Sequence, residues 1–274
     1  MSEAQVIEKT PRLNTRESLA RDFSIIGMDK GVTVIVHSSL SSLGWVCGGP
    51  VAVIQALMDI VTNEGTIVMS THSGDYSDPS YWGNPPIPKE WLPIIKETMP
   101  AYEPEIAPSR GMGKIVETFR CFPGVIRSSH PSLSFAAWGK NAKLIVSNHS
   151  LENALGEDSP LARIYDLDGQ VLLLGVGYNS NTSFHLAEYR TPGTKPCQAG
   201  APIVENGQRT WKTYNDIEFD ADIFPQIGTD FEVERPVKQE IVGLAKSKYF
   251  KQREAVDYAK NWLTKKRKDS DEIT

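Results

Sequence analysis

The chain has 274 residues, of which 40% are hydrophobic and 23% charged, a composition that supports a sizeable core. We therefore expect one domain over residues 1–274. Its 29 basic and 34 acidic residues give a net charge of −5 with no basic stripe, which argues against nucleic acid as the main ligand.

Three cysteines, Cys47, Cys121 and Cys197, are odd in number and form no C-x-x-C pair, so neither a disulfide framework nor a thiolate zinc site is indicated. The first residues lack the basic and apolar regions of a signal peptide, and no run approaches membrane-spanning length. We expect a cytoplasmic protein, monomeric or homodimeric, that does not associate with membranes.

The first part of the chain predicts a parallel βαβ unit. Asn14 and Thr15 can cap a covering helix, and residues 32–36 then form a β-branched strand. Pro50 stands at a typical first position of a helix that runs to about residue 61. A second strand is predicted at 66–70, which requires a right-handed crossover.

The loop after the first strand offers hydroxyl groups at 38, 39, 41 and 42 and glycines at 44, 48 and 49. Backbone amides and hydroxyls beside a helix start can hold phosphate. Neither a Walker loop nor a dinucleotide fingerprint is present. A serine-rich turn without a ligand is the alternative interpretation.

Residues 72–108 form an insertion with eight prolines and several aromatic residues. Long ordered insertions often act as lids or binding walls, and the alternative is a packed loop without a ligand. Carboxylates beside aromatic faces suit a polyamine or amino sugar. The candidate substrate-binding residues are Asp75, Tyr76, Asp78 and Trp82.

The middle of the chain predicts alternating helices and strands. Helices are expected at 112–120, at 141–147 and from Ser159 to Gly169, with a strand at 133–138. The polar turn that contains Arg127 and Ser128 can bind a phosphate or cap a helix.

The stretch 171–190 carries the most informative pattern. An apolar run typical of a buried strand ends at the glycines 175 and 177, and Asn181, Thr182 or Ser183 can cap a following helix. On that helix His185 and Glu188 are spaced i, i+3, so a base and the group that orients it can lie on one face. A surface helix with a casual polar pair is the alternative.

Beyond this helix the pattern becomes antiparallel. Asn206 and Gly207 predict a hairpin over 203–211, within an antiparallel addition at 200–250. A terminal helix and a tail at 267–274 follow. The predicted fold is α/β, with a central mixed, partly parallel sheet flanked by helices and a hairpin near the C-terminus.

Five successive motifs resemble the aminoglycoside 3-N-acetyltransferase family, most closely its YokD-type members from Bacillus. They are H-S-S-L-S-S-L-G at 37–44, R-G-M-G-K-I-V-E-T-F-R at 110–120, R-S-S-H-P-S-L-S-F at 127–135, G-E-D-S-P-L at 156–161 and N-T-S-F-H-L-A-E at 181–188.

The resemblance implies acetyl-coenzyme A as donor. From the residue pattern we expect no metal. The resemblance places Ser38, Ser39 and Ser41 against the donor, His185 as base and Glu188 as its partner. We add five flanking motif residues to the expected cofactor site, namely His37, Leu40, Met112, Arg127 and Ser128. The acceptor implied is an aminoglycoside or related amine. YokD-type members are chromosomal relatives of the resistance enzymes, and we expect the acceptor wall at 72–108 to diverge.

A protonated amine must lose a proton before it attacks a thioester, and His185 can accept it. Thr182 and backbone amides of the Ser38 loop are candidate donors to the oxyanion. No G-x-S-x-G serine is present, and Cys47 has no evident base, so direct transfer is favoured over an acyl-enzyme.

Two other function classes stay open at this point. A metal-dependent hydrolase would use His37, His72, His185 and Asp75, although no compact ligand pair such as H-E-x-x-H is present. A non-catalytic coenzyme A or nucleotide-binding protein is the other alternative.

Overall fold

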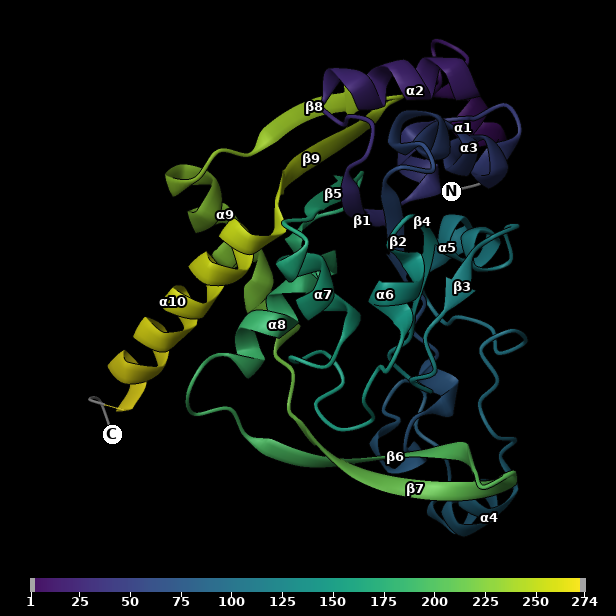
Figure 1. The fold of residues 1–274 in the computed structure, drawn as a ribbon, viewed down its shortest axis with the longest axis vertical. Helices are drawn as coiled ribbons and strands as arrows, with labels where there is room; N and C mark the ends of the chain where they lie inside the picture. Colours follow the sequence, from purple (N-terminus) through teal and green to yellow (C-terminus); the bar gives the residue numbers. More distant parts are fainter. Residues whose placement is uncertain (1–2, 272–274) are drawn as a thin grey trace.

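A seven-stranded mixed sheet forms the centre of the molecule (Figure 1). The computed structural model describes residues 3–271, with side chains as far as residue 268. The strand order is β3-β4-β2-β1-β5-β9-β8, and β1 pairs in parallel with both β2 and β5, whereas the outer pairs are antiparallel. The strands of this sheet are β1 (Thr33–Ser38), β2 (Thr66–Ser70), β3 (Ile126–Arg127), β4 (Phe135–Gly139), β5 (Gln170–Leu174), β8 (Lys238–Val242) and β9 (Ala245–Lys251).

Helices cover both faces of this sheet because alternate residues of its buried strands point to opposite sides. Val34 and Val36 of β1 enter the core beneath α2, α3 and α5, whereas Ile35 enters the core beneath α6 to α10. The helices are α1 (Glu3–Glu8), α2 (Arg16–Ile25), α3 (Gly49–Val61), α4 (Leu92–Thr98), α5 (Gly113–Arg120), α6 (Ala142–Val146), α7 (Pro160–Asp166), α8 (Ser183–Tyr189), α9 (Phe224–Glu234) and α10 (Gln252–Asp271). None of the described helices combines the length and apolar character needed to cross a membrane.

Local sequence signals account for the ends of several helices. Thr15 caps α2, and its hydroxyl accepts a hydrogen bond from the Ser18 amide at 3.2 Å. Ser159 caps α7 in the same way, with Pro160 as the first helical residue. The predicted mixed, partly parallel sheet with flanking helices is thus confirmed.

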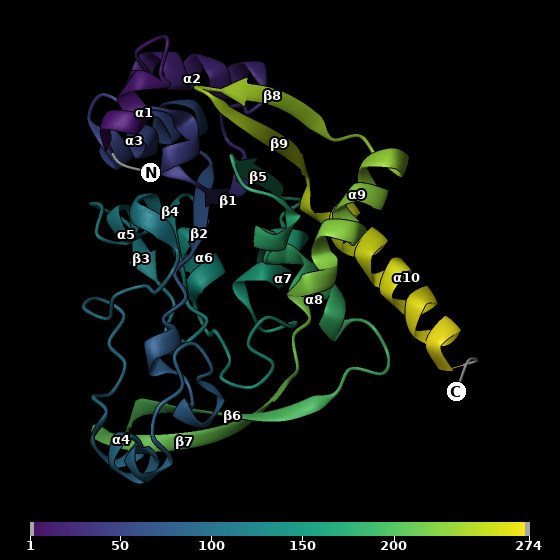
Figure 2. The same cartoon turned by 180° about the vertical axis from the view of Figure 1, so that it is seen from behind.

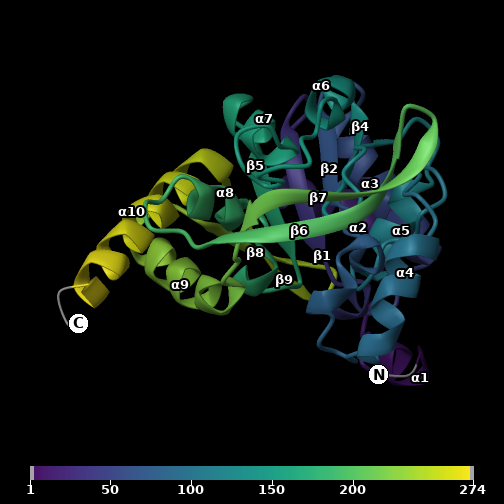
Figure 3. The ribbon, with the colours of Figure 1, turned by 90° about the horizontal axis from the view of Figure 1, so that it is seen from below.

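The predicted hairpin is also present, but it is longer than expected and leaves the main sheet. Strands β6 (Pro196–Glu205) and β7 (Gln208–Ile217) form a separate two-stranded sheet around the turn at Asn206 and Gly207. Figures 2 and 3 show this ribbon crossing one end of the molecule, with α4 beneath it. It therefore joins the 72–108 insertion to the region around α8.

Three expectations need correction. The strand predicted at 133–138 is β4, which begins two residues later, at Phe135, and runs antiparallel to β2. Within 200–250, α9 was not predicted, and β8 and β9 extend the main sheet. Residues 267–271, expected in the tail, continue α10, while 272–274 lie outside the described residues.

Candidate active site

A cavity of about 380 Å³ opens where the three parallel strands end at the same edge of the sheet. Each strand or the loop after it contributes polar side chains to the wall. The lining residues are Val36, His37, Ser38, Ser70, His72, Gly111, Met112, Val116, Val176, Asn179, Ser180, Asn181, Thr182, His185 and Phe224. The fold thus brings His185 and Thr182 together with the loop that follows β1.

His185 and Glu188 form the pair that their spacing predicted. The distance from His185 Nδ1 to Glu188 Oε2 is 2.6 Å, and the Glu188 side chain is only 2% exposed. Glu188 Oε1 accepts a hydrogen bond from the Asp220 amide at 2.9 Å, which fixes the carboxylate. Because a carboxylate only accepts, Nδ1 carries the hydrogen and, in the neutral ring, Nε2 carries the lone pair. His185 is also one of the residues that line the cavity.

Two aromatic rings hold the imidazole of His185 in place. The ring centroids of Phe219 and Phe224 lie 4.6 Å and 4.9 Å from it. These contacts restrict rotation of the imidazole, and its side chain remains 15% exposed. This geometry suits a preorganised base. It does not resemble a chance polar pair on a surface helix, because the Glu188 side chain is buried and the His185 side chain is mostly buried.

Thr182 begins α8 but its hydroxyl does not cap the helix. Its Oγ1 lies 3.2 Å from Ser70 Oγ, and both residues line the cavity. This contact links the end of β2 to the start of α8, so Thr182 and His185 line the same cavity and the Thr182 hydroxyl has a partner.

The other two histidines of the cavity differ from His185 because they are buried without a carboxylate partner. Burial, followed by the proximity of His185, lowers the pKa of His37 to about 4. Burial, followed by His185 and His37, lowers the pKa of His72 to about 3. Both imidazoles are therefore neutral near pH 7 and neither competes for a proton removed from a substrate.

Buried histidines also predict a pH dependence of stability. Burial lowers the pKa of His149 to about 4, as it does for His37 and more so for His72. The unfolded chain binds these protons near the ordinary pKa of about 6.5, so stability is lost as the pH falls below that value. We expect the free energy of unfolding to drop between pH 7.5 and 5.5 by about 1 kcal/mol for each such histidine.

Urea denaturation at the two pH values measures this difference. In the His149→Asn variant the difference between the two pH values should shrink by about 1 kcal/mol. Equal unfolding free energies at both values in the unmodified protein would contradict the assignment of buried neutral imidazoles.

A second cavity of about 640 Å³ lies against the serine-rich loop. Ser38, Ser39, Leu40 and Ser41 line one side of it, and residues 111–115 line another. Ser38, Gly111 and Met112 line both cavities, so the two spaces adjoin at these residues. A long ligand in the larger cavity can thus reach the His185 cavity.

The loop has features that fit a phosphate-bearing ligand. Ser38 Oγ is buried without a hydrogen-bond partner, and Lys114 contributes a cation to the larger cavity. Gly44 and Gly48 adopt left-handed φ values of 79° and 84°, which most other residues avoid. The chain therefore turns from β1 into α3 close to the N-terminus of that helix, and the amides of Trp45, Cys47 and Gly49 in this turn donate inside the fold.

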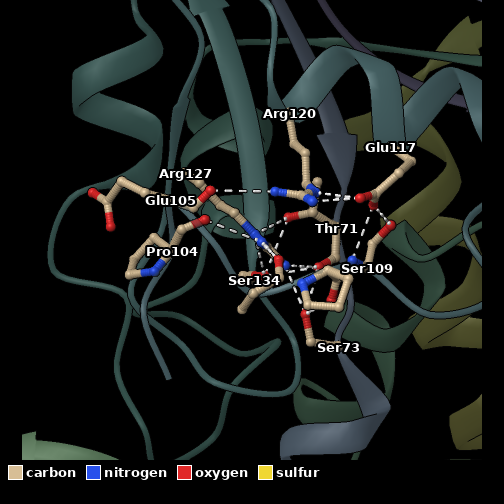
Figure 4. A network of polar contacts seen from close by, with 11 residues as sticks. Thr71, Ser73, Pro104, Glu105, Ser109, Glu117, Arg120, Arg127 and Ser134 are labelled. Atoms are coloured by element: carbon tan, nitrogen blue, oxygen red, sulfur yellow. Dashed lines mark hydrogen bonds and ion pairs between the residues drawn. The ribbon is translucent and has the colours of Figure 1, made fainter. Parts of the chain in front are cut away.

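Arg127 and Ser128 are not in either cavity. The Arg127 guanidinium donates to Thr71 O and Ser73 Oγ, each at 2.6 Å, and to the carbonyl oxygens of Pro104 and Ala107 (Figure 4). Ser128 is 1% exposed, and its Oγ accepts from the Phe135 amide at 2.9 Å. Because their polar groups are used inside the fold, these two residues are dropped from the proposed cofactor site.

Arg127 instead anchors the insertion to the end of β2, and its loss should destabilise the fold. In the Arg127→Met variant, the carbonyl oxygens of Thr71, Pro104 and Ala107 lose a charged donor. We expect the free energy of unfolding to fall by about 2 kcal/mol in urea denaturation.

Arg16→Met serves as the matched control for this change. Arg16 pairs with Asp59 on the surface, where both side chains are about 40% exposed. Because solvent screens such exposed pairs, this substitution should have a much smaller effect than Arg127→Met. Equal effects of the two substitutions would contradict the anchoring role of Arg127.

The four candidate substrate-binding residues do not line the His185 cavity. Asp75 pairs with Arg110, and Asp78 pairs with Lys96 at 2.8 Å. Tyr76 packs edge-on against Tyr102, while Trp82 donates to Ser77 Oγ at 2.9 Å and lines a separate surface cavity. The structure therefore places them in the insertion, each with a partner of its own.

The residues of the metal-hydrolase alternative are only partly brought together. His37, His72 and His185 share one cavity, whereas Asp75 pairs with Arg110. Among residues 3–268, no group of three potential ligands is arranged to hold a metal ion. Cys47 is exposed and is not part of either cavity wall.

Sequence reasoning missed three contributors to the site. Asn181 was considered only as a possible helix cap, yet its side chain lines the cavity. Asp220 and Phe219 contact the His185–Glu188 pair from a segment more than thirty residues away in sequence. No local sequence signal links Asp220 or Phe219 to His185. For Asn181 a signal was present, because it directly precedes Thr182.

Comparison with known proteins completes the description. Residues 35–264 match the family model described as aminoglycoside 3-N-acetyltransferase. The chain is 51% identical to the SPbeta prophage-derived aminoglycoside N(3')-acetyltransferase-like protein YokD of Bacillus subtilis, over 94% of this chain and 96% of that protein. It is 33% identical to aminoglycoside N(3)-acetyltransferase VII of Streptomyces paromomycinus, with 97% of each chain covered.

Solved structures agree with these matches. The crystal structure of YokD from Bacillus subtilis superimposes with a TM-score of 0.94 at 50% identity, covering 95% of this chain and 97% of that one. The binary complex of AAC-IIIb with CoASH gives a TM-score of 0.84 at 28% identity, covering 93% and 98%. Sisomicin-bound AAC-VIa gives 0.85 at 28% identity, covering 93% and 99%.

Proposed function

Because this chain belongs to the aminoglycoside 3-N-acetyltransferase family, and is thus an acyltransferase, we propose that it acetylates an amino group of an aminoglycoside or related amine. Acetyl-coenzyme A is the proposed donor. The observation that carries this proposal is the His185–Glu188 pair. Its two side chains are 2.6 Å apart, and His185 lines the same cavity as Ser38 of the serine-rich loop.

His185 acts as the general base in this scheme. Its Nε2 takes a proton from the acceptor ammonium, while Glu188 keeps the imidazole oriented and stabilises the positive charge that forms. The freed amine then attacks the thioester carbonyl carbon. Proton transfer from the imidazolium to the departing thiolate returns His185 to its starting state, and the attacking nitrogen releases its second proton to solvent as the amide forms.

Direct transfer fits the surroundings of the base better than an acyl-enzyme. Ser38 and Ser70 both line the cavity, but Ser38 Oγ has no hydrogen-bond partner and Ser70 Oγ contacts Thr182. A serine nucleophile needs a base within hydrogen-bond reach. Neither hydroxyl is hydrogen-bonded to His185, so we assign no covalent intermediate.

The larger cavity is the proposed donor site. Its Ser38–Ser41 side and Lys114 suit phosphate and pantetheine groups, and Met112 lines both this cavity and the His185 cavity. The solved complex of AAC-IIIb with CoASH supports this choice of donor. His37 and Leu40 flank the same loop and complete the proposed set.

The acceptor is proposed at the level of chemical class. Sisomicin is bound in the related AAC-VIa structure, which supports an amine-bearing sugar. The 72–108 insertion is the proposed outer wall, with Asp75, Tyr76, Asp78 and Trp82 facing the more distant parts of a large acceptor.

A thiol-release screen with acetyl-coenzyme A across an amine library tests this function. At least one aminoglycoside or related amine should release thiol and yield an N-acetylated product by mass spectrometry. Thiol release without any amine would point instead to thioester hydrolysis. Absence of both, with acetyl-coenzyme A still bound, would indicate a non-catalytic binding protein and overturn the proposal.

A further inference from the structure

Unpaired polar atoms gather at the His185 cavity. Among residues 3–271, nine buried side-chain nitrogen or oxygen atoms have no hydrogen-bond partner, and five of them belong to residues that line this cavity. They are His37 Nε2, Ser38 Oγ, His72 Nε2, Asn181 Nδ2 and Asn181 Oδ1. Leaving such atoms unpaired costs about 1–3 kcal/mol each, which indicates groups kept ready for a ligand.

Asn181 is the clearest case among these residues. It is 0% exposed, and both polar atoms of its carboxamide lack a partner. Its backbone is well held, since its amide donates to Tyr178 O at 2.9 Å and its carbonyl accepts from the Phe184 amide at 3.1 Å. The side chain therefore contributes no hydrogen bond to the fold while it forms part of the cavity wall four residues before His185.

We propose that Asn181 is a further catalytic residue, whose Nδ2 donates a hydrogen bond to the carbonyl oxygen of the acetyl thioester. This inference rests on the proposed function. When the amine nitrogen bonds to the carbonyl carbon, the π electrons move to this oxygen, and a fixed amide donor stabilises the negative charge. The electron pair on the oxygen re-forms the carbonyl bond as the carbon–sulfur bond breaks. The thiolate takes the proton that His185 removed, and the new amide nitrogen loses its remaining extra proton to solvent.

Asn181 differs from the donor that the sequence suggested. The Thr182 hydroxyl has a partner, because it lies 3.2 Å from Ser70 Oγ and either hydroxyl can donate in this contact. Asn181 Nδ2 has two N–H groups and no partner for either. Exchange of the amide nitrogen and oxygen positions does not alter the argument, because both atoms are unpaired.

The test compares Asn181→Leu and Asn181→Asp with the unmodified protein. Both variants remove the N–H donors at similar size. We expect kcat to fall by about 10²–10³-fold, as for loss of an oxyanion donor, with both KM values within about threefold. Because the leucine variant relieves a buried unpaired amide, its thermal midpoint should equal or exceed that of the unmodified protein. Asn261→Leu, on the exposed face of α10, is the control and should change neither kcat nor the thermal midpoint.

Several outcomes would overturn the inference. An unchanged kcat in a folded variant excludes the donor role, and a rise confined to the acceptor KM assigns Asn181 to acceptor binding. A lower thermal midpoint in both variants without ligand makes the residue structural. If the unmodified protein acetylates no amine, the proposed function itself fails and the inference fails with it. If both Asn181 variants acetylate the amine as fast as the unmodified protein, the inference fails while the proposed function stands.

Discussion

Replacing His185 by alanine is expected to lower kcat by about 10²–10⁴-fold while the Kd for acetyl-coenzyme A stays within about twofold. The reason is that His185 Nε2 is the lone pair proposed to take the acceptor proton, whereas the proposed donor site is the adjoining cavity, whose wall does not include His185. The measurement is steady-state turnover with a true acceptor, together with calorimetric binding of the donor.

Glu188→Gln is the matched variant for this change. It keeps the imidazole and a hydrogen-bond acceptor for Nδ1 but removes the charge that stabilises the imidazolium, so its loss of kcat should be smaller. Circular dichroism confirms that each variant is folded. If folded His185→Ala retains near-normal turnover, the base must be another group and the proposed mechanism is wrong.

The second large effect is expected at the serine-rich loop after β1, which contains Ser38 and Ser39. Replacing Ser38 and Ser39 together by leucine adds bulk on the cavity wall and removes two hydroxyls, of which Ser38 Oγ is buried and unpaired. We expect the Kd for acetyl-coenzyme A to rise about 100-fold, equivalent to about 2.7 kcal/mol, while acceptor affinity changes far less. Isothermal titration of the folded variant with each ligand measures the two affinities.

Ser24→Leu provides the control for this double substitution, because Ser24 is exposed on α2 and contributes to neither cavity. It should leave both affinities unchanged. Donor binding that is unaffected in the double variant would refute the placement of acetyl-coenzyme A against the loop. An equal loss of both affinities would instead indicate a general distortion of the site.

Local sequence patterns were sufficient for the elements that build the catalytic edge. The β-branched run gave β1, the residues 66–70 gave β2 with identical bounds, and the spacing of His185 and Glu188 placed both on one face of α8. Each of these features depends on residues close in sequence, and the two strands are buried on both faces. Periodicity and caps are reliable guides in such segments.

Long-range contacts explain what the sequence did not reveal. Arg127 resembles a phosphate ligand in its local motif, yet its guanidinium is used by carbonyl oxygens of the insertion and by Thr71. The antiparallel direction of β4 depends on its pairing with β2, and local pattern carries no information on strand direction. Asp220 reaches Glu188 only because the chain returns from the β6–β7 hairpin to the start of α9.

The pH dependence of kcat at saturating donor is the most direct test of the central claim that His185 is the general base. A protonated imidazole cannot accept a proton, so kcat of the unmodified protein should fall on the acid side. His37 and His72 stay neutral until the pH approaches the range of about 3–4, because burial lowers the pKa of each, and so they do not produce this limb. We predict that the acid limb is present in the unmodified protein and absent from the residual activity of His185→Ala. An acid limb of the same midpoint in the alanine variant would contradict the account.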